Sequence, residues 1–265
     1  MRILVSNDDG IYSEGLWTLA EALSEVGEVI VCAPDREQSA VGTAVTLHYP
    51  LRMKQVEPKV NGIRTYSVEG TPADSVILGL KLISGDGVDL IVSGINEGVN
   101  LGNDVYISGT LGAAIQGHFY GIRSIAISTA LYQGKVRFEA AAKIVRLLAI
   151  GCREGNLPNK TLLNVNTPYL PINRIEGVEL TRPGRRTYHD SIEKGYDGKR
   201  DYYWIVRGEP IWEQREGTDI WAIQNKRISI TPLPVSLSGE RTDKLKEICA
   251  SVFSELHTEA ASNPS

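Results

Sequence analysis

Two adjacent carboxylates, Asp8 and Asp9, follow an apolar segment at residues 2–6 and precede Gly10. Burying two like charges side by side costs free energy unless a cation compensates them. Hard oxygen ligands of this kind favour magnesium, manganese or calcium over a softer metal. The alternative is an exposed turn whose acids cap a helix, and the position of the pair at the end of a predicted strand favours the metal site.

Two further polar segments follow predicted strands. Ser39 lies in the segment 34–40 (PDREQSA), and its hydroxyl is a candidate metal ligand unless the segment is a capped surface turn. Asn96 lies in the segment 93–104 (SGINEGVNLGND), where glycine and asparagine allow the backbone to approach a ligand closely. A flexible linker is the alternative for this second segment, but its side-chain amides favour a binding loop.

Ser108, Gly109 and Thr110 begin a predicted helix directly after the second of these segments. The free backbone N–H groups and the positive dipole end of such a helix attract an anion. Small side chains leave these amides accessible. Because most helix starts are only caps, this anion site depends on the polar segments lying beside it.

The elements that position these residues alternate between strand and helix. Apolar β-rich segments predict strands at 2–6, 28–33, 89–93, 124–128 and 161–166. Helical periodicity and capping signals predict helices at 13–25, 71–83, 109–120 and 138–152. This order predicts an α/β fold with a doubly wound, mostly parallel Rossmann-like sheet flanked by helices. Ligands bind beyond the carboxyl ends of such strands, so the polar segments should converge there.

The pattern changes after about residue 176. Aromatic and alternating segments at 202–206 and 220–230 predict hairpins, and their Tyr and Trp content suits either a subunit interface or local core packing. We expect a single α/β domain at 1–257, with a core at 1–175 and a hairpin extension for oligomerisation at 176–233. A C-terminal helix at 234–257 follows, used in oligomerisation, and a disordered tail at 258–265.

Composition limits the classes of function. The formal net charge is −4, and basic residues are scattered, which argues against binding a nucleic-acid polymer. The N-terminus enters a strand directly and no apolar stretch is long enough to span a bilayer, so we expect no membrane association. The chain has three distant cysteines, which indicate neither a disulfide framework nor a zinc site; a cytoplasmic location is expected.

Several motifs occur together and in a recognisable order: 7–10 (NDDG), 34–40 (PDREQSA), 70–76 (GTPADSV), 93–96 (SGIN), 108–110 (SGT), 164–168 (NVNTP) and 229–233 (SITPL). On these motifs the chain resembles, nearly end to end, SurE, the stationary-phase survival protein family of metal-dependent 5'/3'-nucleotidases. The resemblance implies hydrolysis of nucleoside 5'- and 3'-monophosphates to nucleoside and inorganic phosphate, with short polyphosphate as a further substrate. It also implies a homodimer or homotetramer, and the family suggests dimers that exchange C-terminal segments.

The resemblance also implies roles for individual residues. Asp8, Asp9, Ser39 and Asn96 would bind one divalent cation, Mg or Mn, and Asn7, Ser108, Gly109 and Thr110 would line the phosphate site. Two positions depart from the family pattern: Ile107 stands where tyrosine is common, and Gln116 lies near a position where glutamate is common. The departure at Ile107 leaves the metal ligands unchanged but alters the substrate contacts expected near it.

Asp8 and Asp9 are the candidate catalytic residues. We hypothesise that a cation neutralises phosphate charge and activates water, that one of the two carboxylates takes the proton, and that the amides of Gly109 and Thr110 hold the developing charge. A covalent phosphoryl group on Asp8 is the alternative.

Three rival classes share the early acidic pair or the fold class. Haloacid-dehalogenase-like phosphatases need Asp-x-Asp, but the segment 7–10 has Asn or Gly where one of the acids is required. A receiver-type, non-hydrolytic metal- and phosphate-binding signalling module needs a phosphorylatable Asp where this chain has Asn96. A dinucleotide-binding protein needs glycines in its first strand–helix turn, where this chain has acids.

Overall fold

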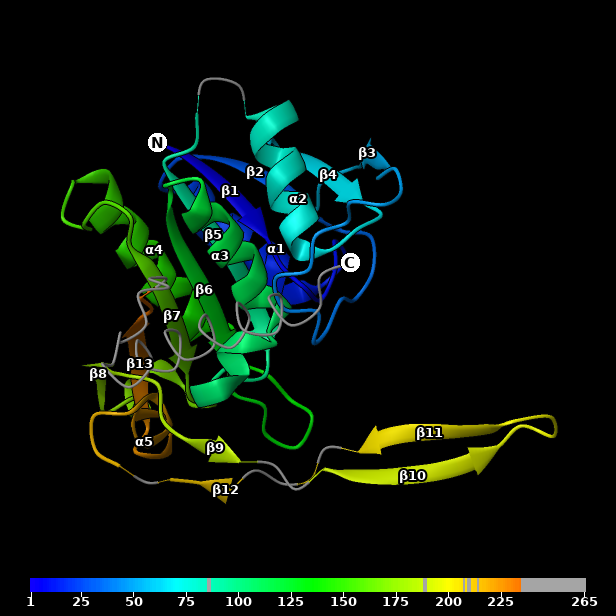
Figure 1. Cartoon of the computed structure of the whole chain (residues 1–265). Coiled ribbons are helices and arrows are strands. Elements are labelled where there is room, and N and C mark those ends of the chain that lie inside the picture. The colour runs from blue at the N-terminus through cyan, green and yellow to red at the C-terminus, as the bar shows by residue number, and fades with distance from the viewer. Residues whose placement is uncertain (85–86, 188–189, 207, 209–210, 214, 235–265) are drawn as a thin grey trace, which may run out of the picture. The chain divides into compact units, whose positions relative to one another are not determined.

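A nine-stranded sheet dominates the part of the chain that the computed structural model describes, residues 1–84, 87–187, 190–206, 208, 211–213 and 215–234 (Figure 1). Its strand order is β3-β4-β2-β1-β5-β6-β7-β13-β8. The strands are β1 (Arg2–Ser6), β2 (Glu28–Pro34), β3 (Met53–Gln55), β4 (Arg64–Val68), β5 (Leu90–Glu97), β6 (Arg123–Thr129), β7 (Leu162–Thr167), β8 (Gly177–Leu180) and β13 (Arg227–Pro232). β4, β2, β1, β5, β6 and β7 run parallel, while β3 and β13 pair antiparallel with β4 and β7. The predicted mostly parallel α/β sheet is confirmed.

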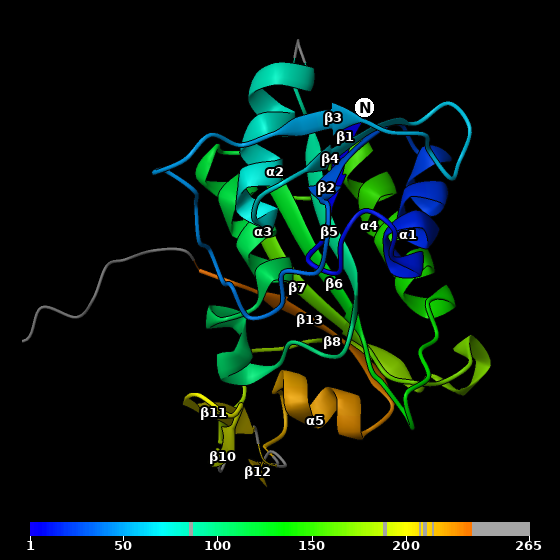
Figure 2. The same cartoon turned by 90° about the vertical axis from the view of Figure 1, so that its right-hand side faces the viewer.

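Helices cover both faces of this sheet (Figure 2). The helices α1 (Glu14–Ser24) and α4 (Glu139–Arg153) lie on one face, and α2 (Pro72–Leu78) and α3 (Gly109–Phe119) lie on the other. Because successive strand residues point to opposite faces, Ile3 and Val5 pack in the core beneath α1 and α4, whereas Leu4 packs in the core beneath α2 and α3. Burial on both faces explains why the central strands are continuous apolar runs.

The helix starts follow the capping signals of the sequence. Ser13 caps α1 by accepting the N–H of Leu16, and Ser108 caps α3 in the same way. Thr71 and Asp74 form a capping box at the start of α2. The segment predicted as one helix at 71–83 divides into α2 and a π-helical continuation, η1 (Gly79–Ile83). The short 3₁₀ segments η2 (Gly102–Tyr106) and η3 (Ile172–Arg174) lie in connecting loops.

The topology places a crevice next to the first strand. From β1 the chain passes to β2 on one side, whereas from β5 it passes to β6 on the other, so the strand order reverses between β1 and β5. Ligands of doubly wound sheets bind at this reversal, outside the carboxyl ends of the strands. Residues directly after β1 and at the end of β5 are therefore placed at the expected ligand crevice.

The C-terminal third differs from its prediction. The hairpin predicted at 220–230 is wrong: this stretch forms a helix, α5 (Asp219–Gln224), followed by β13. Thr218 caps α5 by accepting the N–H of Trp221, and Ile220 and Ala222 are buried. Alternating apolar residues in so short a segment are compatible with either a strand or a helix. Here the N-cap and the burial of the apolar residues favour the helix. β8 and β13 extend the main sheet instead of forming a separate hairpin.

A hairpin is nevertheless present where 202–206 predicted one. β10 (Ser191–Tyr196) pairs antiparallel with β11 (Asp201–Val206), and in Figure 1 the two strands extend away from the main sheet. β9 (Arg186–Thr187) and β12 (Ile211–Trp212) form a second short antiparallel pair. We call β9 to β12 the arm.

Residues 1–233 form one compact unit. The predicted C-terminal helix at 234–257 and tail at 258–265 lie, apart from Pro234, outside the described residues, so the single domain at 1–257 stays a prediction. Among the described residues, no helix combines the length and apolar character needed to cross a membrane. The cytoplasmic location also stays a prediction.

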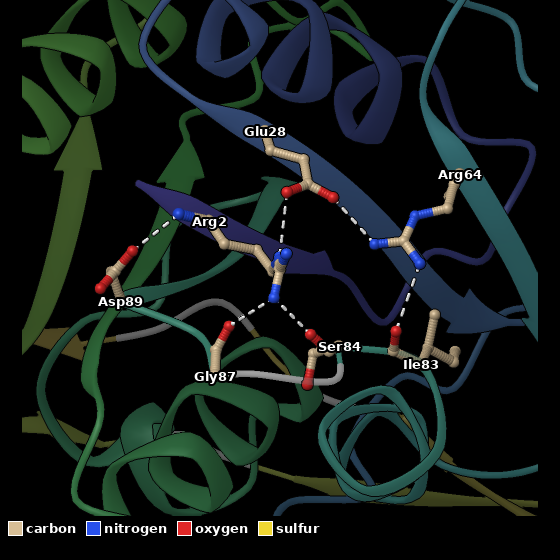
Figure 3. A network of polar contacts seen from close by, with 7 residues as sticks. All are labelled: Arg2, Glu28, Arg64, Ile83, Ser84, Gly87 and Asp89. Atoms are coloured by element: carbon tan, nitrogen blue, oxygen red, sulfur yellow. Dashed lines mark hydrogen bonds and ion pairs between the residues drawn. The ribbon is translucent and has the colours of Figure 1, made fainter.

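A polar network joins the amino ends of the central strands (Figure 3). The Arg2 guanidinium donates to Glu28 Oε2 at 3.0 Å and to the carbonyl oxygens of Ser84 and Gly87 at 2.5 and 3.3 Å. The other oxygen of Glu28 accepts from Arg64 at 2.8 Å. This network lies at the edge of the sheet opposite the carboxyl ends, which makes its role structural.

We therefore expect Arg2→Met to lower the free energy of unfolding by about 1–2 kcal/mol, because two carbonyl groups and one carboxylate lose a charged donor. Urea denaturation measures the loss. Arg52→Met is the matched control, since Arg52 makes a solvent-exposed ion pair with Glu69 that should contribute under about 0.5 kcal/mol. Equal losses for the two variants would contradict a structural role for the network.

Candidate functional site

A polar cavity of about 410 Å³ lies at the carboxyl ends of β1 and β5. Asp8, Asp9, Ser39, Asn96 and Ser108 all line it, although they come from different segments of the sequence. The acids follow β1, Ser39 lies in the loop after β2, Asn96 is near the end of β5, and Ser108 caps α3. The convergence expected from a parallel sheet is thus observed for these five residues.

The start of α3 approaches Asp8 closely. Asp8 is 5% exposed, and its Oδ1 accepts a hydrogen bond from Thr110 Oγ1 at 2.6 Å. The backbone N–H of Thr110 donates to the same carboxylate. A Cβ atom at position 109 would lie 2.8 Å from Asp8 Cβ, so Gly109 lets the helix start come this near. The positive dipole end of α3 therefore faces a carboxylate.

Burial controls the protonation of both acids in the absence of a bound cation. It raises the pKa of Asp8, although the hydrogen bonds from Thr110 act in the opposite direction. Burial also raises the pKa of Asp9 to about 7, with smaller contributions from the charges of Asp8, Glu97 and Glu37. Among the described residues, Asp9 Oδ2 is buried and has no hydrogen-bond partner. In the described part of the chain, Asp9 therefore has one buried oxygen that no hydrogen bond compensates.

Ser39 and Asn96 are held with their oxygen atoms available as acceptors. Ser39 Oγ donates its proton to Glu37 Oε1 at 2.6 Å, so the lone pairs of Ser39 Oγ can act as acceptors or metal ligands. Asn96 Nδ2 donates to the carbonyl oxygen of Gly98 at 2.6 Å, which leaves Oδ1 as an acceptor. The pairing of β5 with β6 shifts register between Ser93 and Asn96, and such an irregularity re-aims a side chain at the strand end.

Asn7 and Thr110 are fully buried, and their side-chain donors are already used. Asn7 Nδ2 donates to the Gly10 carbonyl at 3.0 Å and to Ser13 Oγ at 2.7 Å, so it holds the turn between β1 and α1. The Thr110 hydroxyl is bonded to Asp8. Of the four residues predicted for the phosphate site, only Ser108 is among those lining the cavity, and the role of this set stays a prediction.

The sequence reasoning missed several residues that line the cavity: Glu37, Glu97, Asn100, Asp104 and Leu131. Four of them lie within the two polar segments already identified, so their position after a strand was the available signal. Leu131 carried no such signal, because only the path of the chain after β6 places it there.

The acids of the cavity do not form a simple all-acid metal cluster. Within the described part of the chain, no group of three or more His, Cys, Asp or Glu side chains is arranged to hold a metal ion. The predicted ligand set differs in kind, since it combines two carboxylates with a hydroxyl and an amide oxygen. Mixed oxygen sets of this type suit magnesium and manganese.

Known proteins are similar to this chain in sequence and in fold. The family model for Survival protein SurE matches residues 3–190. The protein named 5'-nucleotidase SurE from Dehalococcoides mccartyi (strain CBDB1) is 48% identical over 248 residues, which cover 93% of this chain and 94% of the relative. The protein of that name from Vibrio parahaemolyticus is 44% identical over 91% of this chain and 92% of the relative.

A solved structure agrees with these matches. The crystal structure of SurE protein from Aquifex aeolicus superimposes with a TM-score of 0.79 at 39% sequence identity, covering 94% of this chain and 100% of that chain. The sequence matches and the fold thus lead to the same assignment, and the chain belongs to the SurE family.

Proposed function

We propose that this chain is a divalent-metal-dependent phosphatase that hydrolyses nucleoside 5'- and 3'-monophosphates to nucleoside and inorganic phosphate. The observation that carries the proposal is the meeting of Asp8 and Asp9 with the start of α3 in one polar cavity. Relatives named 5'-nucleotidase that match more than nine-tenths of the chain support the substrate class. Short polyphosphate is a further expected substrate, because it presents the same kind of terminal phosphate group.

The residues of the cavity fit one magnesium or manganese ion held by Asp8, Asp9, Ser39 and Asn96. Two buried carboxylates with raised pKa values need positive charge, and Asp9 Oδ2 has no partner among the described residues. Ser39 and Asn96 add neutral oxygen acceptors. When bound, such an ion neutralises phosphate charge and promotes attack by water.

The protein groups divide the remaining tasks. Thr110 fixes Asp8 through its hydroxyl and its backbone N–H, so Asp8 is the more rigidly held carboxylate. Asp9 is less buried, and its Oδ2 has no partner among the residues that the structure describes, which suits it to exchange a proton. The start of α3, beside Ser108, directs its positive dipole end to where an anionic phosphate would lie. Relatives named 5'-nucleotidase favour a hydrolase over the receiver-type signalling module.

We expect the purified chain to release inorganic phosphate from 5'- and 3'-nucleoside monophosphates with magnesium or manganese and to lose this activity with chelator. Asp8→Asn and Asp9→Asn should each lower kcat/KM by at least about 100-fold, the usual contribution of a positioned acid–base or charged group. A colorimetric phosphate assay measures the rates. Glu57→Gln, which changes an exposed carboxylate, is the control and should keep full activity. Full activity in both aspartate variants would refute the site.

The raised pKa of Asp9 also predicts how pH affects the stability of the metal-free protein. The pKa is about 3.9 in an unfolded chain and about 7 in the folded one. The stabilisation from the bound proton is therefore complete below about pH 4 and is lost as the pH rises through about 7. The metal-free protein should be less stable at pH 8 than at pH 5.

Asp9→Asn should remove much of that loss. We expect it to raise the free energy of unfolding of the chelator-treated protein by about 1–3 kcal/mol at pH 8 and by less at pH 5. Urea denaturation at the two pH values tests this, with Glu57→Gln as the variant that should change neither. A gain of the same size at both pH values would show that ionisation of Asp9 is not the cause.

We further propose that the chain forms a homo-oligomer, a dimer or tetramer, through the hairpin β10–β11. The hairpin exposes large apolar side chains, including Trp204 at 64% and Ile205 at 74% exposure. An isolated two-stranded hairpin is marginally stable in water, and exposed aromatic residues are typical of interfaces. A second copy of the chain would cover these side chains and pair with the outer edges of β10 and β11, which no other described strand covers.

Replacing Trp204 and Ile205 together by aspartate should therefore shift the protein toward monomer, because charge cannot be buried in such an interface. Light scattering coupled to size-exclusion chromatography measures the mass. Leu47→Asp serves as the control, since Leu47 is an exposed apolar residue outside the arm. An unchanged mass in the double variant would place the interface elsewhere.

A further inference from the structure

A buried carboxylate outside the cavity connects distant parts of the chain. Asp219, the first residue of α5, is 0% exposed. Its Oδ2 accepts the backbone N–H of Gly102 at 2.8 Å, and its Oδ1 accepts those of Gly184 at 2.7 Å and Ile220 at 2.8 Å. Burial raises the pKa of Asp219, while the three N–H donors act in the opposite direction. A desolvated carboxylate is costly unless it is bonded in this way.

Helix capping does not account for these bonds. The N-cap of α5 is Thr218, whose hydroxyl accepts the N–H of Trp221. Among the bonds of Asp219, only the one from Ile220 lies within α5. The donors Gly102 and Gly184 are 117 and 35 residues away in the sequence, so the carboxylate joins separate segments.

Gly102 begins the segment that forms one wall of the cavity. η2 starts at Gly102 and contains Asp104, and it leads directly to Ile107 and Ser108; these last three residues line the cavity. The N–H groups of Ile107 and Ser108 both donate to the Asp104 carbonyl, at 3.1 and 3.0 Å, so the wall is one hydrogen-bonded unit. A displacement of Gly102 would therefore be transmitted to the lining residues.

Asn100, two residues before this segment, is fixed from another element. The backbone N–H of Asn100 donates to Asn166 Oδ1 at 2.8 Å, and Asn164 Nδ2 donates to the Asn100 carbonyl at 2.8 Å. β7 thus holds the chain at Asn100, and Asp219 holds it two residues later. Two anchors so close together define the direction in which the wall leaves the sheet.

Gly184 connects the same carboxylate to the base of the arm. It precedes β9, which contacts η2 and pairs with β12. A Cβ atom at position 184 would lie 2.8 Å from Ile220 Cδ1 and 3.2 Å from Asp219 Oδ1, so this contact leaves no room for a side chain. The base of the arm and the wall of the cavity therefore share one buried acceptor.

We propose that Asp219 is a positioning residue of the cavity: by accepting the N–H of Gly102 and of Gly184, it holds the wall that carries Asp104, Ile107 and Ser108 and ties this wall to the arm. Its effect on substrate rests on the nucleotidase function proposed above. Asp8 and Asp9 follow β1, which the sheet holds independently, and Ser108 is also fixed as the cap of α3. Loss of Asp219 should therefore displace Asp104 and Ile107 most and disturb the fit of the nucleoside more than the phosphate chemistry. Asp219 also lies outside the segment 3–190 that the family model matches.

The decisive variant is Asp219→Asn, which keeps the size of the side chain but has only one acceptor oxygen. It cannot accept N–H groups at both ends, so either Gly102 or Gly184 loses its partner. We expect KM for a nucleoside monophosphate to rise about tenfold while kcat changes less than about threefold, as for a small misplacement of a binding group. Hydrolysis of p-nitrophenyl phosphate, which lacks a nucleoside, should keep its kcat/KM.

An amide NMR spectrum gives a readout that does not depend on activity. In the variant, the N–H signal of Gly102 or Gly184 should shift as it loses a carboxylate acceptor, and those of Asp104, Ile107 and Ser108 should shift with it. If the wild type hydrolyses no nucleotide, the proposed function fails, but these shifts still support the positioning of the wall. If the wall signals and KM are both unchanged, the positioning role is overturned.

Two further variants separate positioning from general loss of stability. Ser124→Ala removes a buried hydroxyl that donates to the Ile122 carbonyl at 3.1 Å near the amino end of β6, at the edge of the sheet opposite the cavity, and should leave KM and the wall signals unchanged. A similar rise in KM for Ser124→Ala would overturn the proposal. Should Asp219→Asn not fold, Gly184→Ala pushes on the same carboxylate from the arm side and should raise KM in the same direction; no rise would count against the proposal.

Discussion

The close approach of the α3 start to Asp8 is the interaction on which the rest of the site depends. Two neighbouring carboxylates leave the sheet at the end of β1, in a region where burial raises the pKa of both. The Thr110 hydroxyl and N–H and the dipole of α3 offset part of this cost for Asp8. Asp9 receives a hydrogen bond from the backbone N–H of Glu97, but its Oδ2 has no partner in the described part of the chain. The imbalance explains why the cavity suits a cation and why Asp9 is the more responsive of the two acids.

The geometry of the sheet turns this local arrangement into a site. Because β1, β2 and β5 run parallel, the loops that follow them open at one edge, and the reversal of strand order between β1 and β5 separates those loops enough to form a cavity. Ser39 and Asn96 then face the acids although they are far apart in sequence. The opposite edge carries the Arg2 network, which ties the strands together where no ligand is expected. Chemistry and stability are thus placed at opposite ends of the same strands.

The wall formed by η2 shows a second level of organisation. Its lining residues come from the central part of the chain, but its anchors come from β7 and from α5. The C-terminal third therefore helps to position the wall of the cavity, although none of the described lining residues comes from it. The same buried carboxylate that holds the wall also holds the base of the arm, so contacts made by the arm and the shape of the cavity share a structural element.

The sequence alone determined the central strands, the main helices and the acids at the end of the first strand. Short apolar runs rich in β-branched residues, such as 28–33, favour buried strands. Caps such as Ser13, Thr71 and Ser108 mark helix starts through local hydrogen bonds. The motifs at 7–10, 34–40 and 93–96 also contain the four proposed cation ligands, whose oxygen chemistry is a property of residue type. These features are local, so they can be inferred from neighbouring residues.

Tertiary structure alone decided the features that depend on distant partners. The segment 219–224 became a helix because Ile220 and Ala222 are buried beside the sheet, although its alternation also suited a strand. Leu131 lines the cavity, and Asp219 accepts the N–H of Gly102, because the folded chain brings these distant residues together. No sequence motif indicates either contact. Asn7 and Thr110 lie near Asp8 as predicted, but their side chains donate hydrogen bonds to other residues of the protein. Asn7 Nδ2 donates to Ser13, and Thr110 Oγ1 donates to Asp8. Which donor meets which acceptor depends on packing across the whole fold, and no local pattern contains that information.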